Sequence, residues 1–82
     1  MTSRVTLIGK PGCHLCDDAR ATVAAVCSES GETFEEWSIL EDPALYDEYS
    51  ERIPVVLVDG RPHDFWRVDP VRLRTALAAR PS

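Results

Sequence analysis

The sequence predicts an α/β fold, a three-layer sandwich with the element order β-α-β-α-β-β-α around a mixed four-stranded sheet. Three observations lead to this prediction. A short apolar run is followed by a Pro-Gly turn and an alanine-rich segment with helical periodicity. Farther along the chain, two Asp-Pro pairs each mark the start of a helix. Between them lie two segments rich in strand-forming residues, joined by an Asp-Gly turn that is typical of a hairpin.

Length and composition fit one soluble globular domain over residues 1–82. Of these 82 residues, 44% are hydrophobic and 28% are charged, which is typical of a chain that folds. The net charge of −5 disfavours binding to nucleic acid or to anionic membranes, so we expect neither partner. The N-terminus has no apolar segment of the length that a signal peptide requires, and three cysteines do not suggest a disulfide framework. We therefore expect a cytoplasmic monomer.

The first strand and the first helix are predicted from the opening third of the chain. Arg4–Ile8 is rich in β-branched and aliphatic residues and is closed by glycine and proline, as expected of a buried strand. The helix is predicted over about Cys13–Glu29, and Gly31 supplies its stop. Apolar residues at steps of three and four give this helix one buried stripe. The stripe consists of Leu15, Ala19, Val23 and Val26.

The second strand and a short second helix follow. Phe34–Ile39 alternates weakly and places Trp37 and Ile39 on one face of a strand. Strand, helix and strand in this order imply a right-handed crossover and parallel pairing. Asp42 is the predicted N-cap of the second helix, with proline at its first position and an end near Ser50. The apolar residues of this helix are Leu45, Tyr46 and Tyr49.

The last third of the chain predicts a hairpin and a helix. Ile53–Val58 is the strongest strand pattern, and the Asp59-Gly60 turn predicts a return along Phe65–Val68. Asp69 and the proline after it start the last helix in the same way as before. The residues after this helix, 80–82, are predicted to be frayed. The predicted apolar face of the helix consists of Val71, Leu73, Leu77 and Ala78.

Cys13 and Cys16 are the candidate reactive residues. A Cys-x-x-Cys between a strand and a helix is typical of a thiol-disulfide redox motif. At the helix N-terminus, the Cys13 sulfur would lie beside unpaired backbone N–H groups and the positive end of the helix dipole, which favour thiolate over thiol. Cys16 lies one turn later, within reach of a mixed disulfide formed at Cys13. The motif alone also fits half of a zinc site or two unreactive thiols.

Three segments together carry a resemblance to a known family. They are Gly-Cys-His-Leu-Cys at 12–16, Arg-Ile-Pro-Val-Val at 52–56 and the Asp-Gly turn at 59–60. In this order and spacing they resemble a glutaredoxin-like member of the thioredoxin superfamily, over nearly the whole chain. The resemblance implies a thioredoxin-like fold of the glutaredoxin type. It also implies a thiol-disulfide oxidoreductase in which Cys13 attacks a protein or glutathione disulfide and Cys16 resolves the product. No resident cofactor is expected, and glutathione or a flavoprotein reductase would return the disulfide to dithiol.

Ile53 and Pro54 are the expected substrate-binding backbone. Base rates alone favour a trans bond before Pro54, whereas the resemblance implies a cis bond that faces the redox pair. Antiparallel pairing of the first and third strands would place this proline at the sheet edge where the first strand ends. There the Ile53 backbone could hydrogen-bond an extended substrate segment, as in strand addition.

Three charged residues are further candidates for the site. Lys10 and a protonated His14 would favour a thiolate at Cys13, and Arg67 would bind an anionic group of the substrate. Each of the three also fits a solvated surface residue without a role.

Two further residues are predicted to stand apart from the redox pair. Cys27 follows Cys16 by three helical turns, so we expect it to act as a buried small hydrophobe. His63 is expected at the hairpin end, on the edge of the sheet opposite Cys13.

Rival interpretations use the same cysteines. The segment Arg67-Val68-Asp69-Pro70 lacks the glycine pair with which glutathione-dependent glutaredoxins help hold the tripeptide, so the reductant stays open. A metal-binding module that holds iron-sulfur or copper is the alternative function. Copper chaperones have the order β-α-β-β-α-β, which the predicted helix start at Asp42 disfavours, and a structural zinc site would need four ligands. A third alternative is an interaction domain whose thiols are inert.

Overall fold

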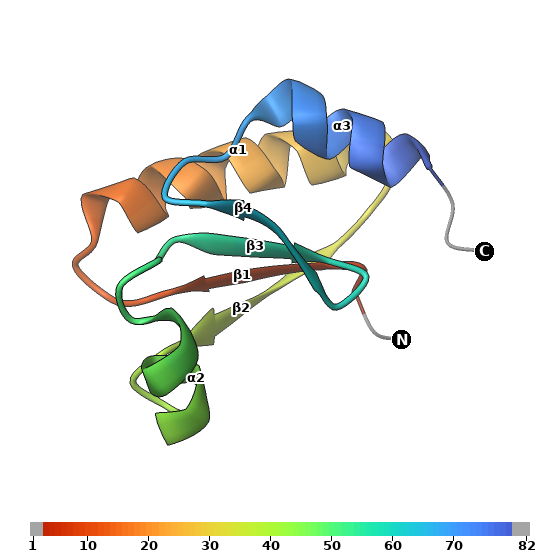
Figure 1. Cartoon of the computed structure of the whole chain (residues 1–82). Coiled ribbons are helices and arrows are strands. Elements are labelled where there is room, and N and C mark those ends of the chain that lie inside the picture. Colours follow the sequence, from red (N-terminus) through yellow and green to blue (C-terminus); the bar gives the residue numbers. More distant parts are fainter. Residues whose placement is uncertain (1–2, 80–82) are drawn as a thin grey trace.

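Figure 1 shows a computed structural model of the chain, in which residues 3–79 are described. The predicted tail at 80–82 lies outside this range. The described residues form strands and helices in the predicted order β-α-β-α-β-β-α. The elements are β1 (Val5–Gly9), α1 (His14–Ser30), β2 (Phe34–Ser38), α2 (Pro43–Tyr49), β3 (Val55–Val58), β4 (Arg61–Phe65) and α3 (Pro70–Ala78).

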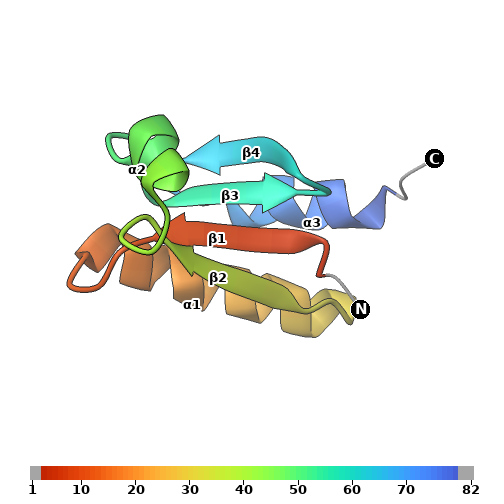
Figure 2. The same cartoon turned by 90° about the horizontal axis from the view of Figure 1, so that it is seen from below.

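The sheet is mixed and has the strand order β2-β1-β3-β4. β1 pairs in parallel with β2 and antiparallel with β3, and β3 pairs antiparallel with β4. Figures 1 and 2 show α1 and α3 together on one face of the sheet and α2 on the other side, at the end where β1 finishes. The predicted three-layer sandwich with a thioredoxin-like arrangement is therefore confirmed.

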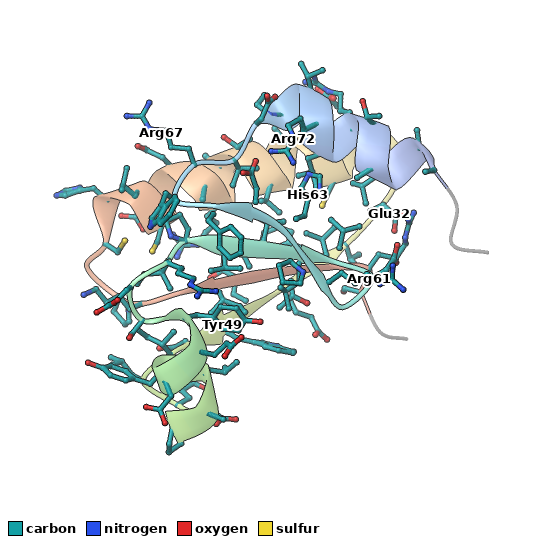
Figure 3. The ribbon with its side chains drawn as sticks, in the orientation of Figure 1. Glu32, Tyr49, Arg61, His63, Arg67 and Arg72 are labelled. Atoms are coloured by element: carbon teal, nitrogen blue, oxygen red, sulfur yellow. The ribbon has the colours of Figure 1, made fainter. Side chains whose placement is uncertain are left out.

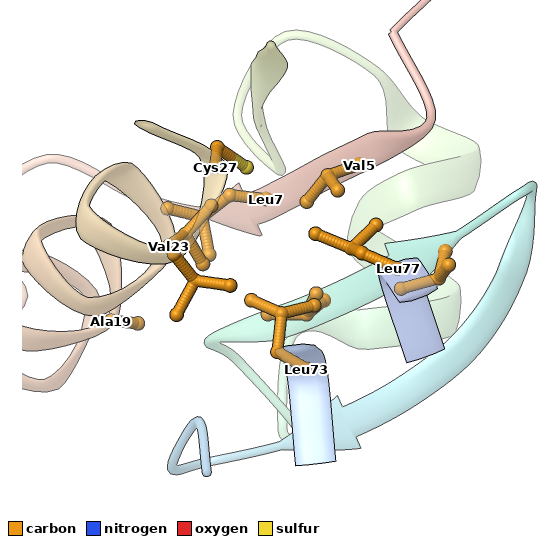
Figure 4. Packing of buried hydrophobic residues seen from close by; sticks show 10 residues of the cluster. Val5, Leu7, Ala19, Val23, Cys27, Leu73 and Leu77 are labelled. Carbon is orange, nitrogen blue, oxygen red and sulfur yellow. The ribbon is translucent and has the colours of Figure 1, made fainter. Parts of the chain in front are cut away.

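Two hydrophobic clusters lie on the two faces of the sheet. Because successive strand residues point to opposite faces, Val5 and Leu7 of β1 pack under α1 and α3, whereas Ile8 packs under α2. Figure 4 shows the larger cluster, in which residues of α1 and α3 meet β1. β1 is thus covered on both sides and forms the rigid centre from which the chain enters the Cys-x-x-Cys turn.

α1 begins and ends as predicted, but its buried stripe differs at the first turn. Gly31 adopts a left-handed φ of 70° and closes the helix through its N–H to the Cys27 carbonyl. Leu15 is 44% exposed, and Cys16 is the buried residue of the first turn instead. The helical period explains the difference, because Cys16 lies on the same face as the buried Ala19 and Val23, and Leu15 is rotated away by one position.

The predicted start of α2 is also confirmed. Asp42 accepts a hydrogen bond from the Ala44 N–H at 2.8 Å, with proline at the first helical position. Leu45 and Tyr49 pack against the smaller cluster, whereas Tyr46 is half exposed.

The last helix begins where the sequence predicts but turns a different face to the core. Asp69 caps α3 by accepting hydrogen bonds from the N–H groups of the second and third helical residues. Leu73 and Leu77 are buried as predicted, but Val71 and Ala78 are exposed. Only a narrow stripe of α3 is buried, where the helix packs against α1. The apolar pattern in the sequence is wider than this stripe and therefore predicts too many buried residues.

β4 lies earlier in the chain than the predicted strand Phe65–Val68. Asp59 and Gly60 both have positive φ, 54° and 80°, so the turn uses only these two residues and the returning strand starts at once. The register places Val56 opposite Asp64 and Leu57 opposite Pro62, so His63 is the extra residue of a β-bulge. His63 therefore lies inside β4 and not at the hairpin end (Figure 3).

The second strand also ends before its predicted boundary. β2 stops at Ser38, after which the Ile39 N–H donates to the Gly9 carbonyl. Ile39 is buried, but Trp37 is exposed on the edge of the sheet, so the two residues do not share an environment. Strand alternation does not carry across the point where the chain leaves the sheet.

Arg4 connects several elements at the end of the molecule away from the Cys-x-x-Cys turn. Its guanidinium pairs with Asp59 in the hairpin turn and with Glu32 after α1, and it donates to the Leu77 and Ala79 carbonyls at the end of α3. The hydrogen bond from Arg4 lowers the pKa of Asp59. Within the described residues, no helix has the length and apolar character needed to cross a membrane.

Candidate redox site

Cys13 lies at the N-terminus of α1, as the sequence predicts, and the structure shows that it is the N-cap. Gly12, in the turn before it, has a φ of 74° that favours glycine. Cys13 has extended backbone angles, and its half-buried Sγ accepts a hydrogen bond from the Cys16 N–H at 3.2 Å. This sulfur takes the place that a serine or aspartate oxygen has in an ordinary N-cap. A backbone donor and the helix dipole therefore both stabilise negative charge on it.

Cys16 lies one turn inside the helix and is almost fully buried, with 1% of its surface exposed. Its Sγ packs on Gly9 so closely that a Cβ added there would lie 2.9 Å from the sulfur. Burial, followed by the hydrogen bond with Cys13, raises the pKa of Cys16 to about 11, although a backbone hydrogen bond from Lys10 acts in the opposite direction. The pair thus consists of one accessible sulfur and one buried sulfur, and both residues are free thiols.

This asymmetry predicts selective alkylation of the reduced protein. At about pH 8 we expect iodoacetamide to modify Cys13 and to leave Cys16 unmodified, because a thiol with a pKa of about 11 stays protonated there and is also buried. Peptide mass spectrometry of briefly treated native protein measures the site of modification. Protein unfolded in urea is the control, in which all three cysteines should react. Faster labelling of Cys16 than of Cys13 in the native protein would contradict this assignment of the two sulfurs.

The loop before β3 lies beside the segment that leads into the redox turn. Ile8 pairs with Val55 in an antiparallel ladder, so Pro54, which precedes Val55, adjoins Gly9, which follows Ile8. The Ile53–Pro54 peptide bond is cis, as the resemblance implies and against the base rate. Pro54 is buried and Ile53 is partly buried against the smaller cluster.

The loop between β4 and α3 reaches the same end of the sheet through Trp66. The Trp66 N–H donates to the Pro54 carbonyl at 2.8 Å, and its indole Nε1–H donates to the Glu51 carbonyl at 3.2 Å. Sequence reasoning missed this residue and placed it inside a strand. The aromatic pair Phe65-Trp66 looks like strand sequence, and no local signal marks the hydrogen bonds to residues far back in the chain.

Arg67 lines a groove of about 300 Å³ between α1 and the loop that connects β4 to α3. Figure 3 shows Arg67 above the first half of α1, at the end of the molecule where the helix begins. Arg67 is exposed, although the strand expected to carry it ends at Phe65. The groove is lined by Leu15, Asp18, Ala19, Thr22, Trp66, Arg67 and Val68.

Lys10 lies three residues before Cys13, His14 lies between the two cysteines in sequence, and both are exposed. Lys10 lines a second cavity of about 280 Å³, which reaches Cys16 from the side of β2 and also contains Arg20 and Glu36. Arg20 forms an ion pair with Glu36 across this cavity. Lys10 is therefore next to the buried sulfur, and His14 is the first residue of α1.

Cys27 and His63 do not join the site. Cys27 is buried in the larger cluster near the end of α1, where burial raises the pKa of its thiol. His63 lies in the bulge of β4, and its buried Nε2 has no hydrogen-bond partner among the described residues. Within residues 3–79, no group of three or more His, Cys, Asp or Glu side chains is placed to hold a metal ion. Within this range the redox turn brings together two sulfur ligands, whereas a structural zinc site uses four.

The sheet order, the three covering helices and a Cys-x-x-Cys pair at the start of α1 define a protein of the thioredoxin fold. The glutaredoxin-like domain family (DUF836) matches residues 4–78, and the chain belongs to this family. The chain is 38% identical to the uncharacterized protein Rv0508 of Mycobacterium tuberculosis, over 92% of this chain and 82% of the relative.

Solved structures agree with the fold. The X-ray structure of target protein XcR50 from X. campestris superposes with a TM-score of 0.76 at 36% identity, covering 94% of this chain and 99% of that protein. The holo form of glutaredoxin C1 from Populus tremula x tremuloides superposes with a TM-score of 0.58 at 16% identity, covering 93% and 84% of the two chains. The second likeness concerns the fold alone.

Proposed function

We propose that the protein is a thiol-disulfide oxidoreductase that reduces protein or glutathione disulfides with the Cys13–Cys16 dithiol. The observation that carries the proposal is the pairing of two unlike sulfurs at the start of α1. The Cys13 sulfur is accessible and accepts a backbone N–H, whereas the Cys16 sulfur is buried one turn later. Disulfide exchange needs one sulfur that attacks first and one that waits.

In the first step, the Cys13 thiolate attacks one sulfur of the substrate disulfide. The Cys13–substrate S–S bond forms, the substrate S–S bond breaks, and the second substrate sulfur leaves as a thiolate. In the second step, the Cys16 sulfur attacks the Cys13 sulfur and releases the bound half of the substrate. The proton of Cys16 passes to this departing thiolate. The substrate gains two electrons, and the protein ends with a Cys13–Cys16 disulfide.

The raised pKa of Cys16 fits this order of steps. Burial is its main cause, followed by the interaction with the Cys13 sulfur. Before the reaction, these effects keep Cys16 protonated and unable to attack first. Once the Cys13 sulfur is bonded to the substrate it carries no charge, so its contribution to the raised pKa disappears. Cys16 therefore becomes easier to deprotonate only when its attack is needed.

Substrate and reductant are part of the proposal. The Ile53 backbone beside Pro54 holds an extended segment of a disulfide-containing protein, and Arg67 contacts an anionic group of it. Lys10 and His14 add positive charge near the Cys13 thiolate. Glutathione or a flavoprotein reductase supplies the two electrons that restore the dithiol. We place this chemistry in the cytoplasm, in a monomer.

The proposal is tested by removing the second step. In Cys16→Ser, the mixed disulfide at Cys13 should accumulate, because a hydroxyl cannot release it. Mass spectrometry after incubation with a disulfide-bonded peptide, and separately with glutathione disulfide, measures the adduct and its position. The double variant Cys13→Ser/Cys16→Ser is the control and should form none. Absence of an adduct at Cys13, together with stoichiometric iron or copper in the purified reduced protein, would instead favour the metal-binding alternative.

A further inference from the structure

We propose that Trp66 is a positioning residue for the disulfide substrate, because it holds the loop Glu51–Pro54 in place beside the redox pair. The inference rests on the proposed function and adds to it a residue outside the Cys-x-x-Cys turn and the proline loop. It assigns a task to the loop between β4 and α3, which contacts the loop before β3 through one exposed aromatic residue.

Trp66 forms two hydrogen bonds with the loop Glu51–Pro54. Its backbone N–H donates to the Pro54 carbonyl at 2.8 Å, and its indole Nε1–H donates to the Glu51 carbonyl at 3.2 Å. A third contact lies alongside, since the Arg52 guanidinium sits 5.9 Å from the centre of the Phe65 ring. The two carbonyls lie three residues apart, so Trp66 spans the whole loop and fixes both of its ends.

Core packing does not account for a tryptophan at this position. The residue is 57% exposed, so its ring contributes little buried area compared with a core aromatic. Its φ of 64° lies in the left-handed region, which a glycine adopts without the cost of about 1 kcal/mol or more that a side chain adds. Such costs concentrate at sites where a fixed geometry serves function. The indole N–H that reaches Glu51 is the feature that a glycine would lack.

The fixed loop leads directly to the reacting sulfurs. Val55, which follows Pro54, pairs with Ile8 of β1, and Gly9 after Ile8 is the surface on which the Cys16 sulfur packs. A substrate segment on the Ile53 backbone is therefore held in register with the redox turn only while the loop keeps its place. Loosening the loop should weaken substrate binding and leave the sulfurs unchanged.

The test is Trp66→Phe, which keeps an aromatic ring and removes the indole N–H. We measure kcat and KM for a disulfide-bonded peptide, with dithiothreitol as the reductant and its uncatalysed rate subtracted. Loss of one hydrogen bond predicts a KM raised by about two- to tenfold. We expect kcat and the rate of Cys13 alkylation to change by less than about twofold, because neither depends on the loop. Tyr46→Phe is the matched control, since Tyr46 is also an exposed aromatic residue with a polar hydrogen but lies on α2, and its KM should not change.

A second variant separates positioning from a merely structural role. Trp66→Gly relieves the left-handed φ but also removes the indole hydrogen bond, so the two effects on thermal stability oppose each other and Tm should change little, while KM rises at least as far as in Trp66→Phe. An unchanged KM in both variants, in an active protein, overturns the role of Trp66 alone. A loss of activity that follows a loss of thermal stability also overturns it. Failure of the wild type to reduce the peptide overturns the proposed function as well.

Discussion

Replacing Cys13 with serine should abolish disulfide reduction while leaving the fold intact. Serine is a preferred N-cap residue, so its hydroxyl can accept the Cys16 N–H that the Cys13 sulfur accepts now. It cannot act as the thiolate nucleophile, and we expect kcat/KM for a disulfide-bonded peptide to fall by roughly a thousandfold or more. Peptide thiols released by reduced protein, followed by chromatography, measure the loss. Circular dichroism of the variant should match that of the wild type.

Cys27→Ala is the matched control for this prediction, because Cys27 is the remaining thiol and lies in the larger core cluster. Its loss should cost some stability but change the rate of peptide reduction by less than about twofold. If Cys13→Ser still reduces the peptide, or if a well-folded Cys27→Ala variant does not, then Cys13 is not the sulfur that carries out the reaction.

Local signals predicted the helix starts and the redox turn correctly. Asp42 and Asp69 each satisfy backbone N–H groups only two or three residues away, so the sequence around them contains the whole interaction. Cys13 as an N-cap is the same kind of interaction, since it involves residues 13 and 16. These features need no knowledge of the tertiary structure.

Strand β4 was misplaced because an edge strand is selected by its partner. Arg61–Phe65 contains a proline and a bulge and has exposed residues, so it does not look like strand sequence. It forms because the two-residue turn at Asp59 and Gly60 sends the chain straight back along β3. The segment 65–68 matches strand propensity better, but only its first residue, Phe65, pairs with a strand, at Val55 of β3.

The residues around the redox pair could not be predicted from the sequence for a related reason. The hydrogen bonds of Trp66 join residues 12 and 15 positions apart, and nothing in the intervening sequence records them. The groove beside Arg67 exists because Leu15 faces outward, toward the loop after β4. Which side of α1 faces the core depends on its packing against α3 and the sheet. The repeat of apolar residues in the sequence is compatible with burial of either Leu15 or Cys16 in the first turn.

Replacing Leu73 with alanine should destabilise the protein strongly, whereas the same change at Val71 should have little effect. The sequence placed both residues on the apolar face of α3, but Leu73 is fully buried against the larger cluster and Val71 is 63% exposed. Removal of a buried leucine side chain lowers the free energy of unfolding by about 2–5 kcal/mol, against about 0.5 kcal/mol or less at an exposed position. Urea unfolding followed by circular dichroism measures both changes.

For a domain of 82 residues, the loss at Leu73 is a large part of a total stability of about 5–15 kcal/mol. Under conditions where Leu73→Ala is still folded, its rate of Cys13 alkylation should match that of the wild type, because the core cluster under α3 does not contain either cysteine of the pair. Equal destabilisation by Leu73→Ala and Val71→Ala would mean that α3 presents a wider face to the core. The groove between α1 and the loop that leads into α3 would then need to be redrawn, and with it the surroundings of Trp66.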